Sequence, residues 1–174
     1  MVLIIAIVIV VLGVVLGIAA SKPDEFTVRR TTRMRATPDR IFPLLNDFHN
    51  WAAWSPWEKM DPTMTKTFSG APSGKGAVYE WSGNSKVGQG RMEITDASPP
   101  RKVVIRLDFM RPFRANNTAE FSLDPQGDST DVTWSMRGGS AFIMKVMGVF
   151  MNMDKMIGRD FEAGLANLKA NAER

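Results

Sequence analysis

The stretch VVIRLDFMRPFRANNTAEFSLDPQGDSTDVTWSMR, residues 103–137, decides the fold because it contains three runs of alternating apolar and polar residues. Alternation with a period of two predicts strands that are covered on one face and wet on the other. A turn at residues 124–128 separates the last two runs. The covered positions are Val103, Ile105, Leu107 and Phe109, then Ala119, Phe121 and Leu123, then Val132, Trp134 and Met136.

Further strands are predicted upstream, at residues 26–35, 64–68, 77–81 and 87–95. Glycine-rich segments separate the last three of these runs. The segment Gly70–Gly76 superficially resembles a phosphate-binding loop, but a strand follows it where such a loop needs a helix. We therefore interpret it as a hairpin turn. The chain is expected to form a curved antiparallel sheet of six to seven strands.

Helical patterns flank the strands. A short helix is predicted to begin at Thr37-Pro38, and a second short helix or turn is predicted over residues 48–54. From Phe142 to Leu168, apolar residues recur at steps of three and four, which predicts one long amphipathic helix against the sheet. Runs of strands followed by a covering helix indicate an α+β fold. A sheet curled around one helix encloses more space than the helix fills, so a cavity is expected.

Residues 1–20 contain no charged, amide or hydroxyl side chain, and 20 helical residues cross about 30 Å of hydrocarbon. We predict a transmembrane anchor at 1–20, a linker at 21–25 and one domain at 26–174. A cleaved signal peptide is the main alternative. The retained helix is favoured because no Lys or Arg precedes the apolar run, which is longer than a usual signal-peptide core.

The charge pattern favours a single-pass protein whose domain is cytoplasmic. Basic residues follow the apolar run, and the positive-inside rule places such residues in the cytoplasm. They are Lys22, Arg29, Arg30, Arg33 and Arg35. The net charge of +4 is spread among acidic residues, with no dense basic run of the kind that binds nucleic acid.

The sequence predicts neither a metal site nor a cofactor. It contains no Cys and only one His, so a zinc ligand set cannot be assembled from them. His49 lies beside Asp47 and Asn50, which favours a role at a turn or helix end over catalysis. No catalytic residue is assigned.

Several segments resemble the START-like superfamily, also called SRPBCC, the helix-grip or polyketide cyclase/dehydrase type. ATPDRIF (36–42), Asp47 and WAAWSPW (51–57) are similar to the family's opening strand-to-helix segment and its tryptophan-containing second helix. YEWSGN (79–84) and FMNMDK (150–155) are similar to a membrane-anchored bacterial branch. The resemblance implies a helix-grip fold around a deep apolar cavity, which relatives use to hold lipids, sterols, polyketides or plant hormones. It carries no catalytic residue to this chain.

Trp51, Trp54 and Trp57 have three interpretations: a cavity wall or lid, ordinary core, or docking on a lipid interface. Arg30, Asn117 and Glu80 are candidates for a polar contact in the cavity or at its rim. The residues expected to line the cavity are Trp51, Trp54, Trp57, Tyr79, Trp81, Ile105, Leu107, Phe109, Phe121, Trp134, Val146 and Phe150.

The sequence favours a membrane-anchored, non-catalytic module that binds a hydrophobic small molecule or lipid. One alternative is an enzyme of the cyclase/aromatase type, whose acid–base groups would come from Tyr79, Glu80 and His49. Another is an accessory membrane protein that interacts with partners and has a filled cavity. The oligomeric state is left open.

Overall fold

The central feature of the fold is one curved sheet. In the computed structural model, which describes residues 1–140 and 142–174 with the side chain of Met153 excepted, seven strands form this sheet. Their order is β1-β7-β6-β5-β4-β3-β2, and every neighbouring pair is antiparallel. The strands are β1 (Glu25–Met34), β2 (Thr65–Gly70), β3 (Ala77–Ser82), β4 (Gln89–Ser98), β5 (Lys102–Arg111), β6 (Ala115–Gln126) and β7 (Ser129–Gly139). The prediction of a six- to seven-stranded antiparallel sheet is confirmed.

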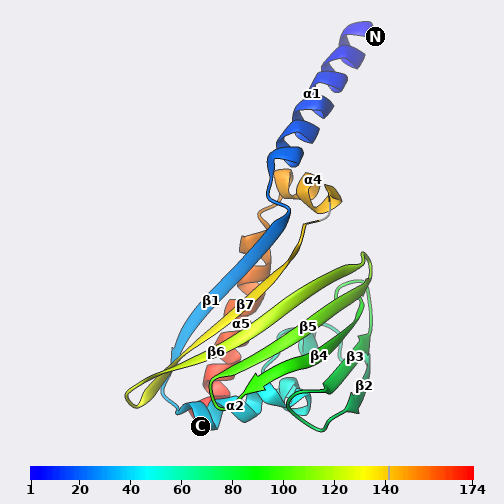
Figure 1. Ribbon diagram of the computed structural model, residues 1–174. Helices are drawn as coiled ribbons and strands as arrows, with labels where there is room; N and C mark the ends of the chain where they lie inside the picture. Colours follow the sequence, from blue (N-terminus) through cyan, green and yellow to red (C-terminus); the bar gives the residue numbers. More distant parts are fainter. Residues whose placement is uncertain (141) are drawn as a thin grey trace.

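The first strand pairs with the last one. The register runs from Glu25 opposite Gly139 to Met34 opposite Thr130. Because Asn117 of β6 lies opposite Gly138, the turn between β5 and β6 lies at the same end of the sheet as the start of β1. The turn between β6 and β7 lies at the opposite end (Figure 1).

The helices cover the concave face and one end of the sheet. They are α1 (Val2–Ser21), α2 (Pro38–Asn46), the 3-10 helix η1 (Phe48–Ala53), α3 (Trp57–Met60), α4 (Phe142–Phe150) and α5 (Met153–Ala172). The helix α5 runs along the sheet beside β1, and α1 projects away from the domain (Figure 1). The fold is therefore α+β with a C-terminal helix gripped by the sheet, as predicted.

The predicted single helix from 142 to 168 is wrong in one respect, because two helices occupy this segment. The backbone leaves helical geometry at Asn152, whose side chain accepts a hydrogen bond from the N–H of Lys155 at 2.9 Å and caps α5. The preceding segment, α4, packs mainly against α1. Of α4, Ile143 and Met144 reach the space in front of the concave face, whereas Val146 and Phe150 do not.

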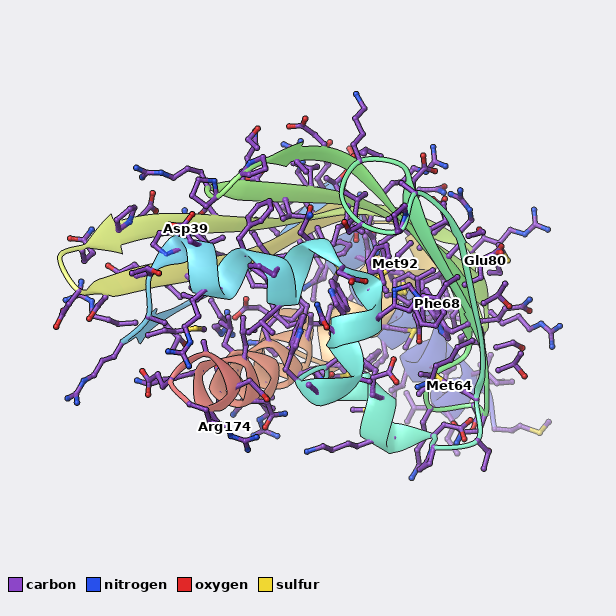
Figure 2. The ribbon with its side chains drawn as sticks, turned by 90° about the horizontal axis from the view of Figure 1, so that it is seen from below. Asp39, Met64, Phe68, Glu80, Met92 and Arg174 are labelled. Carbon is purple, nitrogen blue, oxygen red and sulfur yellow. The ribbon has the colours of Figure 1, made fainter. Side chains whose placement is uncertain are left out.

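One end of the space between sheet and α5 is filled. The helices α2 and η1 cross this end, which Figure 2 views from below. Trp54 is fully buried there, and its ring meets Phe121 edge-on at a centroid distance of 5.9 Å. Its indole N–H donates to the carbonyl of Leu44 at 2.9 Å. This end is a packed core.

The helix α1 is the apolar segment predicted at residues 1–20. It is long and apolar enough to cross a membrane, and a signal sequence has the same properties. It ends at Ser21, and β1 begins at Glu25, so the connection is shorter than the predicted linker.

Candidate functional site

A cavity of about 570 Å³ lies between the concave face of the sheet and α5. It occupies the end of this space that lies away from α2. Its wall is mostly apolar and includes Phe26 of β1, Met92 of β4, and Ile157 and Phe161 of α5. A volume of this size is typical of a site for a small apolar molecule.

Most of the residues expected to line the cavity lie in its wall. The inward positions of β3, β5 and β7 supply the aromatic part because alternate residues of a strand point to the same face. Trp57 contacts Trp134 edge-on at 5.6 Å, and Trp134 stacks on Phe161 at 4.0 Å. The expected residues that line the cavity are Trp51, Trp57, Tyr79, Trp81, Leu107, Phe109, Trp134 and Asn117.

Five expected residues lie elsewhere. Trp54, Ile105 and Phe121 are fully buried in the packed core, because α2 and η1 fill the space in front of them. Val146 and Phe150 belong to α4, which the break at Asn152 turns away from the sheet, and Phe150 is 74% exposed.

Two buried polar atoms in the wall have no hydrogen-bond partner among the described residues. They are the side-chain carbonyl oxygen of Asn117 and the indole nitrogen of Trp134. The amide of Asn117 reaches across to Gly138, where an added Cβ would lie 1.8 Å from Oδ1. A buried polar atom without a partner costs free energy, so each of the two groups would gain from a partner that comes within reach.

A third polar group in the wall is the pair of Tyr79 and Glu58. The Tyr79 hydroxyl donates to Oε1 of Glu58 at 2.9 Å, and Lys66 forms an ion pair with the other carboxylate oxygen. Burial, together with this hydrogen bond, raises the pKa of Tyr79 above its ordinary value. Tyr79 therefore stays protonated and acts as a hydrogen-bond donor.

Asp160 of α5 is an acidic group at the cavity wall. Loss of contact with water raises the pKa of its carboxyl above the ordinary value. No described residue donates a hydrogen bond to it from a side chain. Within residues 1–140 and 142–174, no three His, Cys, Asp or Glu side chains gather in a way that would hold a metal ion.

Arg30 points to the concave face, where α5 supplies its partners. Its guanidinium pairs with Asp154 at 3.0 Å and with Glu162 at 2.7 Å. The hydrogen bonds that Arg30 donates to Asp154 and Glu162 raise the pKa of Arg30, and the same contact lowers the pKa of Asp154. The guanidinium lies over Gly158 and fastens β1 to α5, outside the cavity wall.

The other two polar candidates also lie outside the wall. Glu80 follows Tyr79 on β3, so it points to the outer face of the sheet. His49 lies in η1, where its backbone N–H and its ring nitrogen both contact Oδ1 of Asp47, and its ring stacks on Phe68 at 4.2 Å. This is the helix-end position that was predicted for it.

Sequence reasoning missed Glu58, Asp160 and the residues around the mouth of the cavity, including Phe113 and Ile143. Asp160 lies beside Phe161, which was in the predicted apolar stripe of the helix. The position of Asp160 next to this stripe could have indicated that it lies near the cavity. Glu58 follows the tryptophan-rich run directly, but nothing in the spacing indicated that Tyr79 would reach it.

Comparison with known proteins places this geometry among known folds. A family model described as "Polyketide cyclase / dehydrase and lipid transport" matches residues 25–173. No curated protein sequence gives a significant match. Among solved structures, protein CV1439 from Chromobacterium violaceum has a TM-score of 0.62 at 14% identity, covering 85% of this chain and 97% of its own.

Two further structures are similar at the level of the fold. A protein from Thermobifida fusca has a TM-score of 0.62 at 18% identity, with 84% of this chain and 92% of that chain covered. The di-domain ARO/CYC BexL from the BE-7585A biosynthetic pathway has a TM-score of 0.61 at 16% identity. The match covers 91% of this chain and 53% of BexL.

Proposed function

The chain belongs to the polyketide cyclase/dehydrase and lipid transport family, and from that premise we propose that it is a membrane-anchored protein that binds an apolar small molecule or lipid without transforming it. The observation that carries the proposal is the cavity of about 570 Å³ with its aromatic wall. Burying apolar ligand surface there stabilises the complex by roughly 25 cal/mol per Å², before ordering costs are subtracted. A filled cavity, as an accessory interaction protein would have, is less well supported by a space of this size.

The ligand carries at least one polar group. Asn117 has an acceptor and Trp134 a donor without partners among the described residues, and Tyr79, Glu58 and Asp160 add polar groups to the mostly apolar wall. A ligand that satisfies both is favoured over a pure hydrocarbon, because leaving such groups unpaired in the complex is costly. A long-chain acid, alcohol or polyketide-like molecule meets this requirement.

In this proposal α1 is retained as an anchor, and the domain lies in the cytoplasm. The cluster of basic residues after α1, from Lys22 to Arg35, supports this orientation through the positive-inside rule. An anchor raises the effective concentration of the domain near lipids.

Native mass spectrometry of residues 22–174, followed by organic extraction, tests the proposal. None of the residues of α1 lines the cavity, so this fragment retains the whole wall. We expect a bound small molecule in the parent protein and loss of it in Ala119→Leu, which places a larger side chain inside the cavity. Asn117→Leu should keep apolar ligands but lose preference for those with a hydroxyl or acid group. An empty cavity after incubation with membrane extract would contradict the proposal.

A cyclase-type enzyme is the second candidate, and the Tyr79–Glu58 pair favours it. In this mechanism the Glu58 carboxylate takes a proton from the substrate, and the Tyr79 hydroxyl, which donates to Glu58, holds the carboxylate in position. Glu80 and His49, the other two predicted acid–base candidates, lie outside the wall. If Tyr79→Phe and Glu58→Gln leave bound material chemically unchanged and equally abundant, binding without catalysis is supported.

A further inference from the structure

We propose that the mouth of the cavity faces the bilayer, so that ligand passes between lipid and cavity without crossing water. The docking surface is the mouth rim, defined as α4 together with residues 110–114 at the turn between β5 and β6. This inference rests on the proposed anchoring by α1.

The position of the mouth follows from residues that line the cavity and are also exposed. Phe113 is 55% exposed and Ile143 is 52% exposed, and both belong to the wall. They come from the two segments of the mouth rim, which therefore flank the opening. The register places this end of the sheet next to the start of β1, from which α1 departs (Figure 1).

The mouth rim is fastened to the end of α1. The Nζ of Lys22 donates to the carbonyl of Gly148 at 2.9 Å, and Lys145 pairs with Asp24 at 2.5 Å. Lys22 and Asp24 follow α1 directly, at the level where a membrane-spanning helix leaves the hydrocarbon. With α1 inserted, these contacts hold α4 at the membrane surface.

The mouth rim is unusually apolar for a surface. Outside α1, the four most exposed large apolar side chains among the described residues all belong to it: Phe113, Phe142, Ile143 and Phe150. Exposed apolar clusters mark interaction sites, and Phe on a short amphipathic helix suits the boundary between headgroups and acyl chains.

Charge complements the apolar side chains. Arg111 and Arg114 flank Phe113, and Lys86 lies beside the same opening. All three are exposed, and none forms an ion pair with another residue that the structure describes. Basic side chains near an apolar surface favour anionic lipid headgroups. A bilayer fits this surface better than a second copy of the chain, whose identical basic rim would repel it.

The absence of cysteine from the sequence allows a direct test with the full chain. Single-cysteine variants Met110→Cys and Phe150→Cys carry an environment-sensitive fluorophore, and neither residue lines the cavity. The matched control is Asp128→Cys in the turn between β6 and β7, at the opposite end of the sheet. The proteins are reconstituted in phosphatidylcholine vesicles with and without phosphatidylglycerol, and the lipid tails are brominated.

We expect bromine quenching at positions 110 and 150 and none at 128, with stronger quenching when phosphatidylglycerol is present. Equal, weak quenching at all three positions would overturn the inference. Signals at 110 and 150 that depend on the protein-to-lipid ratio and not on bromine would point to a second copy and would also overturn it. Release of the protein from the vesicles by alkaline carbonate would show that α1 does not span the bilayer. That result would contradict both the proposed anchoring and this inference.

A second measurement separates this inference from the proposed function. Phe142→Ser/Phe150→Ser changes two exposed residues outside the cavity wall. The amount of a pyrene-labelled fatty acid bound should be unchanged, while its rate of transfer from vesicles should fall on the order of ten-fold. An unchanged rate would contradict the inference. Quenching at 110 and 150 in a protein that takes up no fatty acid would support the mouth rim and count against the proposed binding function.

Discussion

The two ends of the space between the sheet and α5 are built from similar side chains, yet one is solid and the other is hollow. Phe121 at the filled end is fully buried, whereas Phe109, inward-facing on the neighbouring strand, is only partly buried beside the cavity. The difference is what covers them. The helices α2 and η1 cover the filled end, while α4, which would cover the other end if it continued α5, is turned onto α1.

This comparison teaches that the absence of a covering helix contributes to the cavity, beside small wall residues such as Ala115 and Ala119. A continuous helix from 142 to 168 would lay Val146 and Phe150 towards the sheet and close the mouth. Because Asn152 caps α5, that helix begins at Met153 and does not continue from α4. The hollow end is thus partly a consequence of where the helix begins.

The largest expected effect separates two phenylalanines. Phe121→Ala should lower the free energy of unfolding by about 3–5 kcal/mol, because it leaves a cavity in a packed core. Phe109→Ala removes the same atoms beside existing space, so the expected loss is about 1 kcal/mol. Urea unfolding of both variants measures the difference. Equal losses would mean that the two ends are equally packed.

Adding volume should again cost more at the filled end than at the hollow end. Ala172 is fully buried near the end of α5, and Ala172→Leu should cost about 2–3 kcal/mol through overpacking. Ala119→Leu points into the cavity and should change the free energy of unfolding by less than about 1 kcal/mol. Thermal unfolding of the two variants, compared side by side, tests this. A large loss in Ala119→Leu would show that the cavity has no room.

Two helical glycines provide a smaller contrast, between a crowded position on α5 and an open position on α4. A Cβ at Gly164 would lie 2.8 Å from the Trp134 ring, while at Gly148 it would lie 3.7 Å from the Lys22 side chain. Gly164→Ala should therefore lose about 1 kcal/mol in free energy of unfolding, even though alanine favours helix. Gly148→Ala should be neutral or gain up to about 1 kcal/mol. The same denaturant titration serves both, and a gain at Gly164 would mean that Trp134 moves aside easily.

The sequence was sufficient for the fold, because alternation in residues 103–137 fixes which face of each strand is covered. It was also sufficient for the inward aromatic residues of β3, β5 and β7, such as Trp81, Phe109 and Trp134. The sequence was insufficient to predict where the C-terminal helical segment breaks and which of its residues face the cavity. Periodicity at Phe142 and Phe150 continues through Asn152, and only the cap hydrogen bond to Lys155 shows that the helix restarts.

Pairings between distant segments were also beyond the sequence. Alternation placed Arg30 inward correctly, but nothing in the pattern indicated that Asp154 and Glu162 would hold it away from the cavity. The same is true of Glu58 and Tyr79, which are brought together by the turn after η1. Such contacts depend on the angle at which helix and sheet cross, and that angle is set by the whole core.

The smallest expected effect concerns Asp160, the acidic group of the hollow end. Its pKa is raised by desolvation, so the ionised form destabilises the folded protein at every pH above the folded-state pKa. That penalty disappears as pH falls below the ordinary aspartate value, where the carboxyl is neutral in both states. Asp160→Asn should therefore raise the free energy of unfolding at neutral pH, by on the order of a few tenths of a kcal/mol because most of the carboxyl still contacts water.

The difference in free energy of unfolding between Asp160→Asn and the parent should shrink to zero as the pH is lowered towards 3. Urea unfolding across the pH range measures this difference. The exposed Asp128, at the far turn, provides the matched control: Asp128→Asn should show no such pH-dependent gain. A ligand with a basic group would reverse the sign of the Asp160→Asn effect on the free energy of unfolding, because the charged carboxylate would then pair with the ligand in the complex. Repeating the titration with bound ligand thus distinguishes an acidic or neutral ligand, which leaves Asp160→Asn the more stable protein, from a cationic one.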